Sequence, residues 1–150
     1  MKADKLYITA FLLAIATSIY GQNNQTQFVN GIDHAILLSC EIELNFPYRF
    51  YKRKTNYEEG VFYNYFDREG ACITVFQGTL VSFPEDTCTY SKKKHFKNKI
   101  TYTGYNDGYY WRKDSYKYVR IYYNNVEKRK KHIFDKILNK IKISCFQNEN

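Results

Sequence analysis

The sequence lacks the short motifs that many small enzymes and metalloproteins display. It contains no G-x-G-x-x-G or G-x-x-x-x-G-K loop for phosphate groups and no G-x-S-x-G turn for a nucleophilic serine. No C-x-x-C or H-x-x-x-H spacing is present to hold a metal ion. The three histidines, His34, His95 and His132, lie far apart in the sequence. These absences argue against a nucleotide-dependent enzyme, a serine hydrolase, a metal centre and a resident cofactor.

Long hydrophobic runs are also absent, except at the start of the chain. Two lysines precede an apolar run from Leu6 to Ile19, which is shorter than the ~20 residues of a membrane-spanning helix. This pattern predicts a signal peptide over residues 1–21, with residues 22–150 forming a single domain without a transmembrane segment. The small residue before Gln22 resembles the cleavage sites of exported bacterial proteins, so we expect a periplasmic or extracellular location. The alternative is an uncleaved N-terminal anchor.

Four cysteines follow the predicted signal peptide. An even number of cysteines in an exported chain predicts two disulfide bonds, for which three connectivities exist. A bond between Cys72 and Cys88 would close a short loop. It would leave Cys40 to pair with Cys145 and tie the first core strand to the segment that follows the last helix. We favour this connectivity over a metal site, because no metal-ligand spacing is present.

Alternation of apolar and polar residues predicts β-strands in the first half of the chain. The clearest run extends from Ile36 to Leu44, and Pro47 is expected to end it. The segment Asp67-Arg68-Glu69-Gly70 predicts a hairpin loop between two further strands, residues 57–66 and 71–77. Val61, Tyr63 and Tyr65 are expected to share one face of the first strand, and Ile73 and Val75 are expected to face the core from the second.

The densest positive cluster is KKKHFKNK, from Lys92 to Lys99, in a chain of net charge +8. It follows a short expected strand, Thr79 to Phe83, and an expected loop, Glu85 to Tyr90. Charge runs of this kind usually form solvated loops, and that is the favoured interpretation. The alternative is contact with a polyanion such as phosphate, sulfate or lipid head groups. The residues that would make that contact are Lys92, Lys93 and Lys94.

The second half of the chain predicts two aromatic strands joined by turns. Asp107-Gly108 is a strong turn signal, and the strand Tyr109–Arg112 follows it. A second turn is expected at Lys113-Asp114-Ser115, before a strand from Tyr116 to Tyr123. The alternation in this last strand places Val119 and Ile121 in the core.

An amphipathic helix is expected from Val126 to Ile143, after a break at Asn124-Asn125. Its apolar residues lie on one side of a helical wheel, which predicts that the helix covers one face of the sheet. Lys130 falls inside this apolar arc, so either its stem passes along the arc or regular packing starts after it. The strand followed by IFDKILNKIKI resembles the closing strand and final helix of small PsbP-like domains. This resemblance implies an antiparallel sheet flanked by helices and assigns no functional residue.

Aromatic residues are unusually abundant, with sixteen tyrosines and eleven phenylalanines. Rows of rings on neighbouring strands often pack against one another across the sheet. They also form rigid surfaces that bind sugar rings or protein partners. We therefore expect Tyr109, Trp111 and Tyr118 to belong to a binding surface. Such rings also stack on single-stranded nucleic acid, but the predicted export argues against that ligand.

Three carboxylates offer the best alternative to a binding role. Glu41, Glu43 and Asp67 would have to provide the acid and base of a small extracytoplasmic hydrolase, and two of them would have to face each other across a pocket. His34 follows Asp33, but neighbouring strand residues point to opposite faces, so His34 is expected to be structural.

Taken together, these patterns predict an α+β fold: a twisted antiparallel sheet of about 5–7 strands with a C-terminal amphipathic helix packed on one face. The favoured function is an exported binding module with an aromatic and basic surface and no catalytic residues. Its partner would be a protein, a glycan or a polyanion, whereas nucleic acid is not expected. The alternatives are the hydrolase and a polyanion-binding envelope protein.

Overall fold

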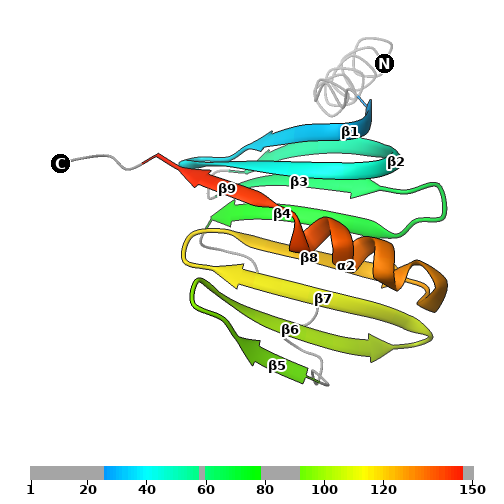
Figure 1. Ribbon diagram of the computed structural model, residues 1–150. Helices are drawn as coiled ribbons and strands as arrows, with labels where there is room; N and C mark the ends of the chain where they lie inside the picture. Colours follow the sequence, from blue (N-terminus) through cyan, green and yellow to red (C-terminus); the bar gives the residue numbers. More distant parts are fainter. Residues whose placement is uncertain (1–25, 58–59, 79–91, 147–150) are drawn as a thin grey trace, which may run out of the picture.

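The computed structural model describes residues 26–57, 60–78 and 92–146, which form a curved antiparallel sheet and a short helix (Figure 1). The strands lie in the order β1-β2-β3-β4-β8-β7-β6-β5, and β9 pairs with β2. The predicted α+β antiparallel architecture is confirmed, but the described residues form nine strands, more than expected. The strands are β1 Gln27–Ile36, β2 Cys40–Tyr57, β3 Gly60–Phe66, β4 Cys72–Gly78, β5 Lys92–His95, β6 Lys99–Asn106, β7 Tyr109–Tyr116, β8 Arg120–Val126 and β9 Lys142–Cys145. The helical elements are η2 Lys128–Lys130 and α2 Lys131–Asn139.

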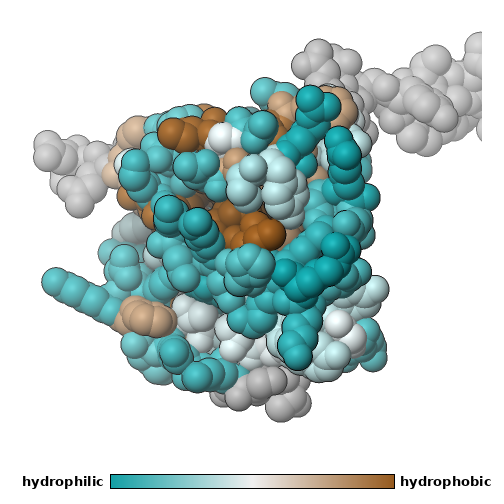
Figure 2. Space-filling model, turned by 45° about the vertical axis from the view of Figure 1, so that its right-hand side comes forward, coloured by the Kyte–Doolittle hydropathy of each residue, from teal (hydrophilic) through white to brown (hydrophobic). Residues whose placement is uncertain are grey.

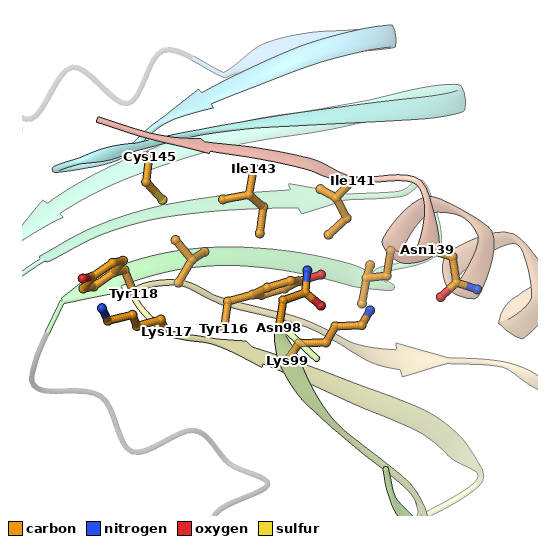
Figure 3. Close-up of a pocket in the computed structure, with 11 residues that line it drawn as sticks. Asn98, Lys99, Tyr116, Lys117, Tyr118, Asn139, Ile141, Ile143 and Cys145 are labelled. Carbon is orange, nitrogen blue, oxygen red and sulfur yellow. The ribbon is translucent and has the colours of Figure 1, made fainter. Parts of the chain in front are cut away.

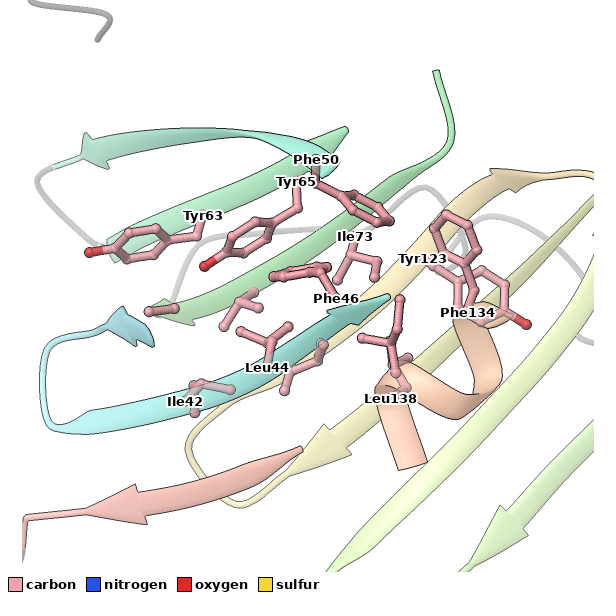
Figure 4. Close-up of a cluster of buried hydrophobic side chains, with 14 of the residues drawn as sticks. Ile42, Leu44, Phe46, Phe50, Tyr63, Tyr65, Ile73, Tyr123, Phe134 and Leu138 are labelled. Atoms are coloured by element: carbon pink, nitrogen blue, oxygen red, sulfur yellow. The ribbon is translucent and has the colours of Figure 1, made fainter. Parts of the chain in front are cut away.

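The core lies between α2 and the face of the sheet that this helix covers, here called the inner face (Figure 4). The Phe134 ring from α2 meets Phe50 and Tyr123 edge-on, with centroid distances of 5.9 and 5.7 Å. Burial of each such side chain stabilises the fold by roughly 1.5–3 kcal/mol before entropy is counted, so these rings anchor the helix. The residues predicted to face the core, Ile73, Val75, Val119 and Ile121, are all buried. Val61, Tyr63 and Tyr65, which were predicted to share one face of their strand, are buried as well.

The strand β2 pairs with β1 along one edge and has two different neighbours along the other. Residues 40–43 pair with β9, whereas residues 51–57 pair with β3. Pro47 lies between these two parts, where the pairing with β1 shifts register. Proline has no backbone N–H to donate, so it is tolerated at such an irregularity. Pro47 therefore does not end a strand as predicted but marks the place where β2 changes neighbours.

The predicted strand from Ile36 to Leu44 is two strands joined by a tight turn. The Leu37 N–H donates to the Cys40 carbonyl over 2.9 Å, and this reverses the chain. Leu37 is buried, whereas Ile36 and Leu38 are about half exposed or more. The turn contains no Gly, Pro, Asn or Asp to signal it. A tertiary contact stabilises it instead, since the Ser39 N–H donates to the Gln77 side-chain oxygen over 2.9 Å.

The basic segment from Lys92 to Lys99 is a β-hairpin, not the loop that was expected. Strand β5 pairs with β6 in the register Lys92 to Thr103 and Lys94 to Thr101. All four residues of β5 are exposed at the end of the sheet. Exposed lysines are common on such edge strands because they discourage pairing with another chain. The segments predicted over Thr79–Phe83 and Glu85–Tyr90 lie outside the described residues.

One of the two predicted turns in the second half is confirmed and the other is wrong. Asp107 and Gly108 have φ values of 49° and 90°, as expected for a tight hairpin turn. Lys113, Asp114 and Ser115, by contrast, lie inside β7. The chain turns after them, where the Tyr116 N–H donates to the Val119 carbonyl over 2.9 Å. The charged Lys-Asp-Ser sequence imitates a turn, but Asp114 is fully buried in an ionic network.

The helix is much shorter than the predicted span of Val126 to Ile143. Val126 still belongs to β8, opposite Tyr110 of β7, and the apolar residues after Asn139 lead into β9. Both of these flanking strands place apolar residues on the inner face, which extended the apparent helical pattern. Lys130 precedes α2, and its Nζ lies 2.6 Å from the Asp67 carboxylate. Regular helix packing therefore starts after Lys130, one of the two alternatives that the sequence left open.

The disulfide between Cys40 and Cys145 is confirmed. The two residues face each other in the β2–β9 register, so the bond holds β9 on β2. Cys72 is buried and forms no disulfide with another described cysteine, and burial raises the pKa of its thiol to about 11. Its predicted partner, Cys88, lies outside the described residues, so the second crosslink stays a prediction.

Reduction of the Cys40–Cys145 bond is expected to lower the free energy of unfolding by about 2–5 kcal/mol, because the bond closes a long loop in the unfolded chain. Urea unfolding of the oxidised and reduced protein measures this difference. The C40A/C145A variant is the control: any remaining response to reductant in that variant would reveal a further disulfide. Equal stability of the oxidised and reduced wild type would contradict the expectation.

Candidate functional site

Positive side chains gather in a cleft on the inner face, between α2 and the strands β5, β6 and β7. The cleft has a volume of about 490 Å³. Alternate residues of neighbouring strands share a face, so the register brings Lys92 beside Thr103 and Lys94 beside Thr101. We call this the basic cleft; it is lined by Lys92, Lys94, Phe96, Lys99, Thr101, Thr103, Arg112, Lys131, Asp135 and Asn139.

A buried ion pair forms the floor of the basic cleft. Two guanidinium nitrogens of Arg112, Nε and Nη2, donate to the two Asp114 oxygens over 2.9 and 2.7 Å. Lys99 and Thr101 also donate to this carboxylate, over 2.6 and 2.8 Å. Burial alone would raise the pKa of Asp114, but its bonds to Arg112, Lys99 and Thr101 outweigh burial, so the pKa lies below its ordinary value.

The same arginine joins the sheet to the helix. Arg112 Nη1 lies 3.2 Å from the Asp135 carboxylate, and Nη2 donates to the Asn139 side chain over 2.8 Å. Asp135 also accepts a bond from the Tyr123 hydroxyl over 3.0 Å and pairs with Lys131 over 2.5 Å. The guanidinium plane is therefore fixed by groups from both walls of the cleft, and it cannot turn away from a ligand without breaking these bonds.

The charges of the basic cleft do not balance. Asp114 and Asp135 are shared by three cations, Lys99, Arg112 and Lys131. Within the described part of the chain, no carboxylate pairs with Lys92 or Lys94, and both side chains are exposed. The basic cleft therefore carries an excess of positive charge that attracts anions.

A second cleft, of about 470 Å³, continues from the first (Figure 3). Lys99 and Asn139 line both clefts and mark their junction. Ile141, Ile143 and Cys145 point from the end of the chain toward Tyr116 and Tyr118. We call this the apolar cleft; it is lined by Asn98, Lys99, Tyr116, Lys117, Tyr118, Val119, Leu138, Asn139, Ile141, Ile143 and Cys145. Figure 2 shows one face of the molecule, which is mainly hydrophilic and has hydrophobic side chains in a central hollow.

The structure brings only some of the predicted binding residues together. Lys92 and Lys94 line the basic cleft, and Tyr118 lines the apolar cleft. Lys93 points to the opposite face of the sheet, where its Nζ lies 5.3 Å from the Tyr102 ring centroid. Tyr109 lies at the far end of β7 from Tyr118.

Trp111 has a structural contact on that opposite face. It lies directly across from Gly104 on β6, and a Cβ atom at residue 104 would come within 2.4 Å of the indole ring. The ring therefore covers a glycine, a known way of stabilising a neighbouring strand. Tyr109, Trp111 and Tyr118 do not form one aromatic platform.

The carboxylates considered for hydrolysis are all engaged in local bonds. Glu41 lies 2.7 Å from the His34 ring, and Glu43 lies 2.8 Å from Lys142. Neither carboxylate lines the basic or the apolar cleft. His34 and Asp33 do point to opposite faces, since Asp33 accepts a bond from Tyr65 over 2.8 Å.

Asp67 supports the predicted hairpin loop between β3 and β4. Its Oδ1 accepts the backbone N–H groups of Glu69 and Ala71 over 2.9 and 3.0 Å. Its Oδ2 accepts from Lys130 over 2.6 Å, and Gly70 takes the positive φ that the loop needs. Both oxygens are therefore occupied by structural bonds, which favours a structural role for Asp67 over acid–base catalysis.

Sequence reasoning missed the centre of the basic cleft. Arg112 was assigned to a strand without a role, and Asp114 to a turn. A signal was present, because Arg112 and Asp114 lie two residues apart and share a strand face. Lys131, Asp135 and Asn139 follow at intervals of four, on one side of the helix.

The D114N variant is expected to lose about 3–5 kcal/mol of stability near neutral pH, because it leaves Arg112 without its buried partner. The Asp114 pKa is lowered in the folded state, so its contribution is complete above the ordinary value of about 3.9 and is lost as the pH falls through the folded-state pKa. Urea unfolding as a function of pH should therefore show a smaller acid-induced loss for D114N than for the wild type.

The matched control for this experiment is D107N, which changes an exposed aspartate in the hairpin turn. Asparagine tolerates the positive φ at this position, so D107N should change stability little. A loss in D114N no larger than that in D107N would contradict the assigned role of the buried pair.

Comparisons of this chain with protein-family models, with curated proteins and with solved structures find no match. The resemblance of the C-terminal strand and helix to PsbP-like domains therefore stays a prediction. Within residues 26–57, 60–78 and 92–146, no helix has the length and hydrophobicity to cross a membrane. The same residues contain no cluster of three or more metal-ligating side chains.

Proposed function

We propose that this protein is an exported binding module that captures an anionic ligand in the basic cleft. The ligand carries a phosphate, sulfate or carboxylate group, the chemistry that arginine and lysine side chains recognise. Export is supported by the apolar segment near the start of the chain and by the Cys40–Cys145 bond, because such bonds persist in oxidising compartments.

The observation that carries this proposal is the excess positive charge around a fixed arginine. Arg112 is about 94% buried and is oriented by Asp114, Asp135 and Asn139 before any ligand arrives. Lys92 and Lys94 stand at the cleft with no carboxylate partner among the described residues. A site whose charges are already in place binds an anion with little loss of side-chain entropy.

Neutral groups in the cleft add specificity for an oxyanion. The Thr103 hydroxyl lies beside Lys92 in the sheet register and lines the cleft, as does the Asn139 amide. Hydroxyl and amide groups donate hydrogen bonds to anionic oxygens, and this favours a compact oxyanion over a diffuse negative surface. A polyanion remains the second candidate, because the lysines of β5 point to both faces of the sheet at its edge.

The K92Q/K94Q variant is expected to bind inorganic phosphate about tenfold more weakly than the wild type, because it removes two cleft cations that pair with no carboxylate of the described residues. Isothermal titration calorimetry at low ionic strength measures the affinity. Binding by the wild type should also weaken as salt is added, because the lysines are exposed and their charges are screened.

The control variant R53Q/K128Q removes the same charge from exposed positions that line neither cleft. Equal weakening by the two variants would show that net charge, and not the basic cleft, attracts the anion. In that case heparin should bind both variants equally, as expected for a diffuse polyanion surface. No measurable binding of phosphate, sulfate or acetate by the wild type would reject the proposal.

A further inference from the structure

The two clefts form one continuous groove with a charged half and an apolar half. Lys99 and Asn139 line both halves. The Lys99 ammonium group is turned toward Asp114, at 2.6 Å, and also lies 5.6 Å from the centroid of the Tyr116 ring. Its charge therefore belongs to the basic cleft while an aromatic ring of the apolar cleft lies next to it.

The apolar half is bordered by two different parts of the chain. Ile141 and Ile143 lie on one side, Tyr116 and Tyr118 on the other (Figure 3). Both isoleucines are only partly covered, and Tyr118 is 51% exposed. Val119 and Leu138 also line the cleft, and both are almost completely buried. Apolar surface left open beside a charged site commonly marks a place where a ligand binds.

The wall formed by β9 is held in place covalently. β9 pairs with β2, and the Cys40–Cys145 bond joins these two strands within the cleft wall. The groove is therefore formed before a ligand enters, and binding of a hydrocarbon chain there does not require the wall to be ordered first.

We propose that the ligand is an amphiphilic anion: its charged group occupies the basic cleft and its single hydrocarbon chain lies in the apolar cleft. This inference rests on the proposed function and adds the chemical class of the ligand. A free single-chain amphiphile and the head group of a membrane lipid share this chemistry. The apolar cleft adjoins the basic cleft along one face of the sheet, so a hydrocarbon chain bound there lies on the protein and not in a bilayer. The groove therefore favours the free molecule.

The test compares three probes on the full protein by calorimetry, below the concentration at which they form micelles. Decyl phosphate carries both parts, methyl phosphate carries only the charge and 1-decanol carries only the chain. Decyl phosphate is expected to bind at least about tenfold more tightly than methyl phosphate, because even an open cleft removes part of the decyl chain from water. Decanol should bind more weakly than decyl phosphate.

Two variants separate the halves of the groove. Y118S/I143T should reduce the ratio of decyl phosphate to methyl phosphate affinity while leaving methyl phosphate binding unchanged. The control I32T/Y57S alters two exposed apolar residues outside both clefts and should leave the ratio unchanged. In the wild type, methyl NMR signals of Ile141 and Ile143 should shift with decyl phosphate and not with methyl phosphate, which tests the site without any substitution.

The outcomes distinguish this inference from the proposed function. Equal affinity for decyl and methyl phosphate would overturn the inference and leave anion binding intact. Binding of decanol as tightly as decyl phosphate would also overturn the inference, and binding of no probe would overturn both. Binding only to vesicles that contain an anionic phospholipid, with no binding of monomeric decyl phosphate, would also overturn the inference, because it would point to a membrane surface as the ligand.

Discussion

The arrangement of the inner face depends on the hydrogen bonds and ion pairs of the buried Arg112 guanidinium group. It bonds to Asp114 on its own strand and to Asp135 and Asn139 on the helix. A cation placed at this depth would be strongly unfavourable without such partners. The aromatic contacts of Phe134 hold α2 on the sheet, and the arginine bonds fix which turn of the helix faces which strand. The basic cleft follows from this arrangement.

Much of the fold follows from local patterns, and the exceptions have identifiable physical causes. The Asp107-Gly108 turn and the Asp67–Gly70 loop were predictable because their residues take backbone conformations that few others adopt. The turn at Leu37 carries no such signal, since a side chain from β4 stabilises it. The pairing of Cys40 with Cys145 was anticipated by elimination among the cysteines, and the register of β2 with β9 explains it.

The candidate site was harder to foresee than the fold. Exposed lysines at 92 and 94 were visible as a charge cluster, but their orientation depends on a hairpin that the charge run concealed. The aromatic residues misled for a related reason. Trp111 is prominent in the sequence, yet it covers Gly104 on the opposite face, whereas Tyr116 and Tyr118 lie at the groove. The pairing register decides which face of the sheet a side chain occupies and which residue lies next to it. Composition alone does not give this information.

The crosslink between β2 and β9 has a consequence for how the protein matures. Its two sulfurs are separated by 105 positions in the sequence, so the bond forms only after nearly the whole domain has been synthesised. The strand that it secures borders the apolar half of the groove. A newly made chain therefore secures this wall of the groove late, once Cys40 and Cys145 have been oxidised to a disulfide.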